Sequence, residues 1–346
     1  MGTLRSGTAQ QDAARRIAAL EQLGGGDPRG GGDTRGAQGP QGAPKRRRPL
    51  RTAAFALVIV LLLVGAGAMA WQALGTGSDA GLSAGSSDGE LVVHFLDVGQ
   101  GDATFIELPD GTCLLIDAGG ADTAADLIAA IQELGYTRID YLVATHPHAD
   151  HIGGMAAVIE AFEIGELWAS AATTTTATYE RFLDAASAAG LTITVAEAGM
   201  TIATAGGCTV TVLGPAADAE TDDLNEASVI VRIDYGTTSF LFTGDASAEN
   251  LPTDAVSVLK VSHHGSNAGL TYELADALSP AIAVISYGLD NDYGHPKQRV
   301  LDILASVGAE VYGTGANGDV TVTSDGTALT VTCEKAGEVT AGEEAS

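Results

Sequence analysis

The fold is decided by one stretch of ten residues, Thr145-His146-Pro147-His148-Ala149-Asp150-His151-Ile152-Gly153-Gly154. Three of the seven histidines fall among six consecutive positions inside this stretch, with a carboxylate between them. Imidazole and carboxylate groups are the ligands that zinc and manganese use in proteins. Because the stretch follows an apolar run at Tyr141–Ala144, we expect a loop at the end of a buried strand whose polar side chains converge on a metal.

Two further strand ends carry residues of the ligand type. Asp245 follows the apolar run Ser239–Thr243 and a glycine, and the pair His263-His264 follows the run Val256–Val261. A carboxylate at such a break can bridge two cations, and two adjacent histidines at a third strand end favour a site over a structural role. Because side chains alternate along a strand, we expect only one of them, His263, to bind metal and His264 to be an outer or phosphate contact.

Outside these motifs, strand-like runs alternate with helical patterns from about residue 90 onward. Strands are expected at Leu91–Leu96, Thr104–Leu108, Cys113–Ile116, Tyr141–Ala144, Leu191–Val195, Cys208–Leu213, Ser228–Tyr235, Ser239–Thr243, Val256–Val261, Ala281–Ser286, Val320–Thr323 and Ala328–Thr332. Helices are expected at Ala121–Leu134, Gly154–Phe162, Ala177–Ala189, Thr271–Leu278 and Lys297–Val307. This α/β order, in which strands paired by turns give way twice to strands alternating with helices, predicts two sheets packed face to face with outer helices.

The chain resembles the metallo-β-lactamase superfamily and, within it, the hydrolase domain of the ComEC competence family, here as a stand-alone chain. The resemblance covers about residues 90–333 and rests on six motifs in order: Phe95-Leu96-Asp97-Val98-Gly99-Gln100-Gly101-Asp102-Ala103, Leu115-Ile116-Asp117-Ala118-Gly119-Gly120, the stretch His146–His151, Thr243-Gly244-Asp245, Ser262-His263-His264-Gly265-Ser266 and Tyr293-Gly294-His295-Pro296. It implies an αββα sandwich that holds two divalent cations, zinc or manganese, at one edge of its sheets.

The same resemblance implies a set of metal ligands: His146 and His148 for one cation, Asp150, His151 and either His263 or His264 for the other, and Asp245 between the two. Asp117 would orient the ligands from outside, as such partners do in metal sites. Gln100, Asp102 and His295 would lie at the substrate side of the pocket. In catalysis, Asp150 could hold a proton of the attacking water, and His295 could donate to a phosphate or leaving group.

One position departs from the pattern of many superfamily members. Where they carry a third histidine for the first cation, this chain reads Leu224-Asn225-Glu226-Ala227-Ser228. Asn225 takes that position and would also face the substrate. An oxygen ligand suits a harder cation, which makes manganese plausible beside zinc.

The N-terminal residues differ in composition from the rest. Residues 1–51 are expected to be a disordered, basic, cytoplasmic segment, and residues 52–74 a transmembrane anchor, because about 20 apolar residues span a bilayer. The basic block before the span predicts a cytoplasmic N-terminus. A signal peptide cleaved near Ala70 is the alternative. Both place the domain outside the cytoplasmic membrane, anchored by a single span or secreted, with a Gly/Ser linker at 75–89, the hydrolase domain at 90–335 and an acidic disordered tail at 336–346.

Charge is unevenly distributed along the chain. The first 51 residues hold ten of the 17 Lys and Arg residues, so that the remainder carries seven basic and 40 acidic side chains. Such a domain repels polyanions unless cations and a local basic patch offset the charge. Lys260, Lys297 and Arg299 lie close in sequence to His263 or His295 and could flank the pocket.

The three cysteines do not identify the compartment, and the apolar run around Cys113 predicts that this thiol is buried.

A pair of close cations can lower the pKa of a bridging water and hold a phosphoryl oxygen, so that hydroxide attacks in line. The sequence therefore predicts an extracytoplasmic metal-dependent phosphodiesterase of the ComEC-like nuclease type, with DNA as the first candidate substrate. One alternative is an esterase of cell-envelope phosphodiesters, such as choline or teichoic-acid phosphates. Another is a non-catalytic tethered binding domain. The sequence indicates no protein partner.

Overall fold

A computed structural model describes residues 89–216 and 223–343. The predicted segments at 1–51 and 52–74, the cleavage position near Ala70 and nearly all of the predicted linker lie outside the described residues. Within the described part of the chain, no helix is both long enough and apolar enough to cross a membrane.

The first sheet has eight strands, and their order across the sheet is β15-β14-β1-β2-β3-β4-β5-β6. Their bounds are β1 (Leu91–Phe95), β2 (Thr104–Glu107), β3 (Cys113–Ile116), β4 (Arg138–Ala144), β5 (Glu163–Ala169), β6 (Ile193–Val195), β14 (Val320–Ser324) and β15 (Leu329–Cys333). Strands β3 to β6 are parallel, while β1 pairs antiparallel with β2 and β14. The carboxyl ends of the parallel strands therefore meet at one edge, where the metal motif of residues 145–154 begins.

The second sheet has seven strands in the order β13-β12-β11-β10-β9-β8-β7. Their bounds are β7 (Thr201–Ala205), β8 (Cys208–Gly214), β9 (Ile230–Tyr235), β10 (Thr238–Phe242), β11 (Val258–Lys260), β12 (Ile282–Ile285) and β13 (Glu310–Gly313). Strands β10 to β13 are parallel. The two other ligand motifs follow β10 and β11, so both emerge at the carboxyl edge of this sheet.

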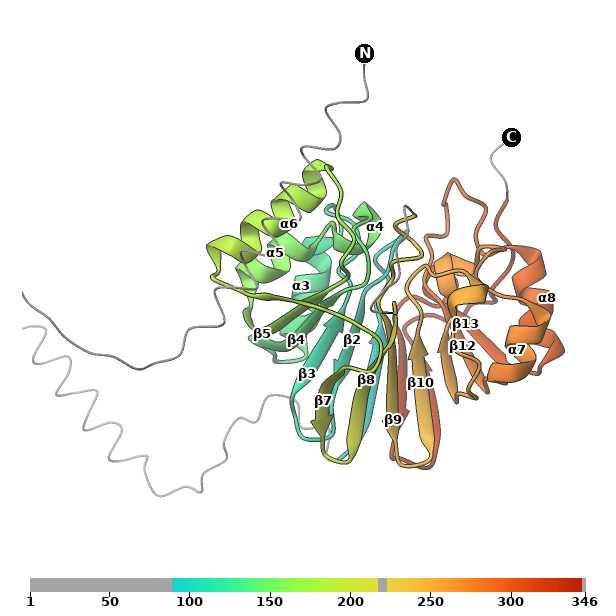
Figure 1. Cartoon of the computed structure of the whole chain (residues 1–346). Helices are drawn as coiled ribbons and strands as arrows, with labels where there is room; N and C mark the ends of the chain where they lie inside the picture. Colours follow the sequence, from blue (N-terminus) through green and yellow to red (C-terminus); the bar gives the residue numbers. More distant parts are fainter. Residues whose placement is uncertain (1–88, 217–222, 344–346) are drawn as a thin grey trace, which may run out of the picture. The chain divides into compact units, whose positions relative to one another are not determined.

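Helices cover the outer face of each sheet (Figure 1). On the first sheet lie α3 (Ala124–Glu133), α5 (Met155–Ala161) and α6 (Ala177–Ala188), and on the second lie α7 (Tyr272–Leu278) and α8 (Gln298–Ser306). Four short elements complete the described part: α4 (Ala149–Ile152), α9 (Thr314–Asn317) and the 3-10 turns η1 (Ala248–Asn250) and η2 (Ser262–Gly265). The predicted pair of sheets with outer helices is confirmed.

The core has three layers. Side chains of both sheets, among them Phe95, Ile106 and Phe240, fill the space between the sheets. The alternating burial along β1 follows from the pleat, since every second residue faces this layer. Two further apolar layers separate the sheets from their helices. Each fully buried large apolar side chain contributes roughly 1.5–3 kcal/mol, so the layers hold the strand ends in fixed positions.

The structure contains three strands that the sequence pattern did not predict. β5 begins with the charged run Glu163-Ile164-Gly165-Glu166, β7 is a short threonine- and alanine-rich strand at the sheet edge, and β13 is only four residues long. All three gain their stability from backbone pairing with a neighbouring strand, which short apolar periodicity does not reveal.

The acidic tail was expected to be disordered from residue 336, but its described part lies against the domain. The Asn317 side chain donates a hydrogen bond to the carbonyl of Gly337, and the amide of Gly342 donates to the carbonyl of Pro296. Val339 packs against the apolar layer under α7 and α8. The tail is held mainly through backbone groups and one valine, a pattern that its acidic composition conceals.

Cys113 is buried, as predicted, and burial raises its pKa to about 12. The other two cysteines, Cys208 and Cys333, are also free thiols.

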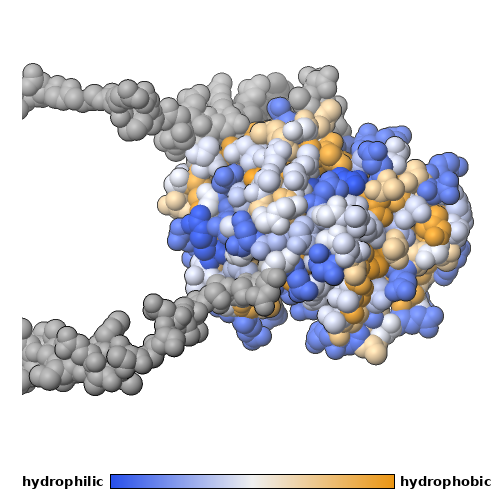
Figure 2. Space-filling view, turned by 90° about the horizontal axis from the view of Figure 1, so that it is seen from below, coloured by the Kyte–Doolittle hydropathy of each residue, from blue (hydrophilic) through white to orange (hydrophobic). Residues whose placement is uncertain are grey.

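On the face of the domain seen from below in Figure 2, hydrophilic and hydrophobic residues are interspersed, so side chains of one kind do not gather there.

Candidate metal centre

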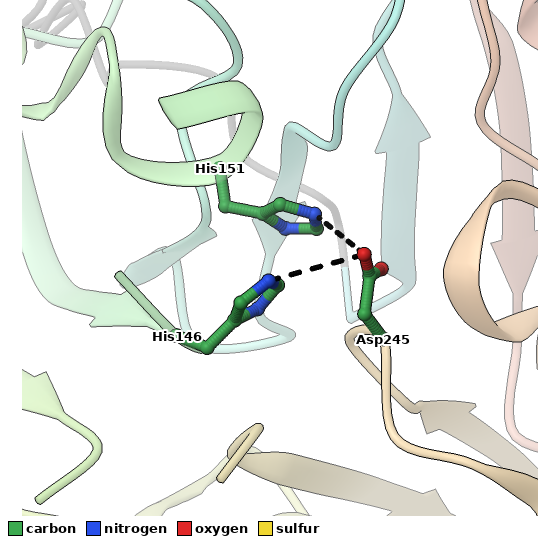
Figure 3. Close-up of side chains that lie close together, drawn as sticks. All are labelled: His146, His151 and Asp245. Carbon is green, nitrogen blue, oxygen red and sulfur yellow. Dashed lines mark ion pairs between the residues drawn. The ribbon is translucent and has the colours of Figure 1, made fainter. Parts of the chain in front are cut away.

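Three strand ends bring the predicted ligands together. β4 ends at Ala144 in the first sheet, while β10 and β11 end at Phe242 and Lys260 in the second. Their following loops meet between the two sheets, where His146 and His151 point toward Asp245 from the opposite side of the site (Figure 3). The site is therefore built by the packing of the sheets against each other.

One carboxylate oxygen forms the centre of the site. Asp245 Oδ2 lies close to the Nε2 atoms of four imidazoles: His151 at 3.3 Å, His264 at 3.6 Å, His263 at 3.7 Å and His146 at 3.9 Å. Burial opposes the ionisation of Asp245, but the charges of His151 and His264 outweigh it and hold its pKa well below the usual value. The centre is thus an ionised carboxylate surrounded by nitrogen ligands.

The outer ring nitrogens of two histidines are fixed by hydrogen bonds. His151 Nδ1 lies 2.8 Å from Asp117 Oδ2, and His264 Nδ1 lies 3.0 Å from the carbonyl oxygen of Ser286. An oxygen of either kind accepts the N–H, so that each Nε2 faces the centre, where it would bind a cation once deprotonated. Asp117 also accepts hydrogen bonds from the backbone N–H and the hydroxyl of Thr145. Asp117 therefore stands where the resemblance placed it, behind the ligands.

His146 and His148 form a second pair of converging nitrogens. His146 Nε2 lies 3.0 Å from His148 Nδ1. On its other side, His146 Nδ1 contacts the hydroxyls of Thr145 at 3.1 Å and of Ser228 at 3.3 Å. The Ser228 hydroxyl also accepts a hydrogen bond from the backbone N–H of Asp245. Ser228 therefore connects the two sides of the centre.

Asp150 lies on the far side of the same carboxylate. Its Oδ2 is 3.3 Å from His264 Nε2. Asp150, His151 and His264 offer three ligand atoms within 4.8 Å of one another, as do His146, His151 and Asp245. The two groups share His151, and His148, which was expected to bind the first cation, belongs to neither.

Unpaired polar atoms test whether these residues fit a metal. Buried atoms that make no hydrogen bond to the described residues include Asp102 Oδ1, His151 Nε2, Asn225 Oδ1, Asp245 Oδ1, His264 Nε2 and His295 Nδ1. Buried polar groups without a partner are rare in folded proteins, and each needs an explanation. These are nitrogen and oxygen donors of the types that zinc and manganese accept. The donor set therefore fits divalent cations.

Asp102 does not lie at the substrate side, where it was expected. It is 4% exposed, and its Oδ2 lies 2.5 Å from the ammonium nitrogen of Lys260, which is 3% exposed. The backbone N–H of Asp102 donates to the carbonyl of Asp150. Lys260 therefore cannot reach a substrate phosphate, because it is buried beneath the ligands and neutralises a carboxylate there.

The backbone of the site adopts unusual conformations. Four non-glycine residues in the described part have positive φ, and three of them are Asp117 (59°), His263 (51°) and His264 (55°). Such conformations are costly and collect at functional sites. Gly101 and Gly154 have no room for a Cβ, because backbone carbonyls of Asp150 and Ala118 lie against them. The glycines of these motifs thus let the loops approach closely enough for the ligands to meet.

A pocket of about 280 Å³ opens over the centre. Its lining consists of Gln100, His148, Ala149, Asp150, Asn225, Asp245, His263, His264, Tyr293 and His295. Gln100, Asn225 and His295 therefore lie where the resemblance placed them. No lysine or arginine of the described residues lines this pocket. Lys297 and Arg299 were expected to flank it, but instead they donate to the carbonyls of Tyr293 and Asn267.

His295 is uncharged near neutral pH. Burial, together with the charges of His264 and His263, lowers its pKa to about 4. Its ring centroid lies 5.9 Å from that of His263 and 6.4 Å from that of His264. His295 is thus suited to donate an N–H hydrogen bond to a substrate oxygen rather than to act as a cation.

The two adjacent histidines differ from the expectation. Strand β11 ends at Lys260, and the left-handed turn that follows directs both imidazoles toward Asp245, so strand alternation does not apply. His264 is buried and belongs to the ligand group with Asp150 and His151, whereas the side chain of His263 is 29% exposed at the pocket wall. The geometry favours His264 as the ligand, which reverses the order that the sequence suggested.

Alanine substitutions should therefore separate the two histidines. We expect His264→Ala to lower cation affinity by at least about 100-fold, the upper range for losing even an outer partner of a ligand. His263→Ala should keep the cations but reduce turnover. Calorimetric titration with manganese and with zinc measures the difference. Both positions share a left-handed backbone, so each variant is the strain-matched control for the other. Equal losses of affinity would contradict this assignment.

Several residues of the centre escaped the sequence motifs. Ser228 and Ser286 are not of the usual ligand type, and Ser286 contributes only its carbonyl oxygen. The sequence marked Lys260 as a cation beside the pocket but did not reveal its buried ion pair with Asp102. Asn291 shapes the His295 loop, because its side chain bonds to the backbone of Gly288, Tyr293 and His295. No side-chain signal marks Ser286, because a residue of any type offers the same carbonyl oxygen.

Comparison with known proteins places the chain in a family. The sequence profile of the metallo-beta-lactamase superfamily matches residues 96–288. ComE operon protein 3 of Bacillus subtilis is 29% identical over 259 residues, which cover 68% of this chain and 33% of that protein. Recombination protein 2 of Haemophilus influenzae is 28% identical over 240 residues, which cover 66% of this chain and 28% of that protein. Competence protein ComA of Neisseria gonorrhoeae is 27% identical over 243 residues, which cover 67% of this chain and 32% of that protein. The chain spans about a third of the length of these relatives.

Proposed function

Because this chain belongs to the metallo-beta-lactamase superfamily and is related to ComEC-type competence proteins, we propose that it is a metal-dependent phosphodiesterase that acts on nucleic acid outside the cytoplasmic membrane. The observation that carries the proposal is the position of Asp245 Oδ2, which lies within 3.9 Å of four imidazole nitrogens at the base of one pocket. A single carboxylate with nitrogen ligands on both sides suits a pair of cations.

The ligands divide into two groups around that carboxylate. His146 and His148 would hold one cation, Asp150, His151 and His264 would hold the other, and Asp245 would bridge them. When bound, two such cations make water a stronger nucleophile and neutralise charge on a phosphoryl group. The sequence prediction of two divalent cations, zinc or manganese, is kept in this proposal.

The residues of the pocket supply the remaining steps. The carboxylate of Asp150, whose pKa lies well below its usual value because His264 and His151 outweigh the effect of burial, stays ionised and can accept a hydrogen bond that orients the attacking water. The Gln100 carbonyl oxygen accepts a hydrogen bond from the Gly288 backbone, which leaves its NH₂ group available to a phosphoryl oxygen. The neutral imidazole of His295 can donate a second hydrogen bond. These groups would orient the diester without adding positive charge.

Two observations bear on the substrate. The relatives are named for competence and for recombination, and both are processes of DNA, which favours nucleic acid. The pocket lining without lysine or arginine and the acidic domain oppose tight binding of a polyanion. We therefore propose a nuclease of low affinity that depends on its cations to attract phosphate. Within the second candidate, an esterase of cell-envelope phosphodiesters, the acidity favours zwitterionic choline phosphates over teichoic acids, which are polyanions.

Metal content and a substrate panel test the proposal together. The full chain, purified without chelator and reconstituted with manganese or zinc, should contain near two equivalents of cation, and a chelator should abolish hydrolysis. The panel consists of DNA, RNA, cyclic dinucleotides, choline phosphodiesters and bis-p-nitrophenyl phosphate. Cleavage of the small diester with no cleavage of DNA or RNA at low salt would replace the nuclease with the esterase. Absence of bound cation after reconstitution would overturn both.

The extracytoplasmic placement is a separate proposal, based on the basic block Lys45–Arg51 before the apolar segment. Protease added to intact cells or protoplasts should digest the domain but spare the first 50 residues. Protection of the domain would show that it lies inside.

A further inference from the structure

An exposed aromatic ring stands at the mouth of the metal pocket. Of the three large apolar side chains that the described residues leave exposed, Tyr272, Leu289 and Tyr293, only Tyr293 lines this pocket. Its side chain is 62% exposed. Its ring lies 5.7 Å from the ring of His295 at an interplanar angle of 19°, so the two rings are stacked. One face of the tyrosine ring therefore lies toward the pocket residue, while much of the ring is open to solvent.

The loop that carries Tyr293 is fixed mainly by the side chain of Asn291. The Asn291 carboxamide donates to the carbonyls of Gly288 and His295, each at 2.7 Å, and accepts from the backbone N–H groups of Tyr293 and His295. Lys297 donates to the Tyr293 carbonyl. Because these hydrogen bonds already restrict the loop, the loop loses little conformational entropy when a ligand binds to the ring. The exposed tyrosine is thus held in place rather than left on a loose surface loop.

We propose that Tyr293 is a stacking subsite for a nucleobase of single-stranded nucleic acid, an inference that rests on the proposed nuclease function. Bases stack on exposed aromatic side chains in proteins that bind single strands, and this contact needs no positive charge. His295 connects the two parts of the pocket, since its ring lies 6.4 Å from His264 and 5.7 Å from Tyr293. A phosphate held at the imidazoles would place a neighbouring base beside the tyrosine.

The charges around the Tyr293 ring determine which part of a nucleic-acid strand the ring can contact. Asp290 and Asp292 are exposed on either side of Asn291, and both line a second, open cavity of about 600 Å³ that also includes Glu343 and shares His295. Carboxylates repel phosphates, so the backbone of a nucleic acid should avoid this loop. An uncharged base can approach it. In a duplex the base faces are buried in the stack, and the subsite therefore favours single strands.

Abasic oligonucleotides test the subsite directly. The full chain, loaded with manganese, is given a single-stranded oligodeoxyadenylate and a matched oligomer in which tetrahydrofuran replaces every base. We expect the ratio of kcat/KM for the intact over the abasic oligomer to be roughly 10 in the wild type, within the range that one stacked base supplies, with the difference mainly in KM. Tyr293→Ala should lower this ratio to near one, and Tyr293→Phe and Tyr293→Trp should keep it. Tyr272→Ala, an exposed tyrosine outside the pocket, is the matched control.

The outcomes separate the subsite from the proposed nuclease. Cleavage of both oligomers with a ratio that Tyr293→Ala does not change would overturn the subsite and leave the nuclease standing. Hydrolysis of bis-p-nitrophenyl phosphate without cleavage of either oligomer would overturn both. If Tyr293→Ala impairs hydrolysis of p-nitrophenyl phosphorylcholine more than cleavage of the intact oligomer, the ring binds a quaternary ammonium group, and the base assignment is wrong.

Discussion

Replacement of Asp245 by alanine should lower the rate of diester hydrolysis by at least about 1000-fold and leave the fold intact. Among the described residues, Asp245 Oδ2 is the one carboxylate oxygen that faces the imidazoles of both ligand groups, so its loss would remove the proposed bridge between two cations. Cations of this kind contribute several kcal/mol to a phosphoryl-transfer transition state, and about 4 kcal/mol corresponds to about 1000-fold in rate.

The measurement has three parts: turnover of bis-p-nitrophenyl phosphate, metal content and the circular dichroism spectrum. Asp276→Ala provides the matched control, since Asp276 is an exposed aspartate on α7, away from the centre. We expect that variant to keep both cations and full turnover. Asp245→Ala should keep the wild-type spectrum with less than one equivalent of tightly bound cation. Turnover within tenfold of the wild type would show that Asp245 is no bridge.

Of the substitutions proposed here, replacement of Asp117 by alanine should have the largest effect on stability. It should lower the free energy of unfolding by at least about 3 kcal/mol. Asp117 is 1% exposed and accepts from the Thr145 N–H, the Thr145 hydroxyl and His151. Each buried donor left without a partner costs about 1–3 kcal/mol. The residue also has a φ of 59°, a conformation that alanine adopts less readily than aspartate or asparagine.

Urea unfolding of the metal-free chain measures this loss without the contribution of bound cations. Asp117→Asn separates packing from orientation, since asparagine keeps the volume, tolerates the left-handed backbone and keeps one acceptor oxygen. We expect it to recover part of the lost stability but to bind cations about 10–100-fold more weakly, because its carboxamide no longer fixes the ring of His151 as the carboxylate does. An unfolding free energy of Asp117→Ala within about 1 kcal/mol of the wild type would contradict the role of Asp117.

The sequence predicted the sandwich from the order of its strand and helix patterns, and it predicted the metal centre because its ligand motifs stand directly after apolar runs. The runs at Tyr141–Ala144 and Ser239–Thr243 lie largely within β4 and β10, and the metal motifs follow them. Strand ends are the places where a sheet presents side chains to a site, so ligand type and position together indicated the centre. The short strands β7 and β13 carried no such signal, because pairing with a neighbour rather than their own pattern stabilises them.

The contacts that sequence could not reveal are those between distant segments. Lys260 was read as a surface cation near the pocket, yet it is buried against Asp102, a residue more than 150 positions earlier. The order of His263 and His264 depended on where β11 ends, and the left-handed turn after it has no signature in two adjacent histidines. Such features follow from tertiary packing, which local periodicity does not determine.

The origin of the ligands in two different sheets has a consequence for how the protein acquires its metal. Residues 146–151 and 245–264 are separated by almost a hundred residues of chain, and neither segment alone holds both ligand groups. Under the proposed extracytoplasmic placement, a chain that crosses the membrane unfolded would carry no complete site, since metal binding is coupled to folding. The identity of the bound cation would then be decided by the ions available where the domain folds.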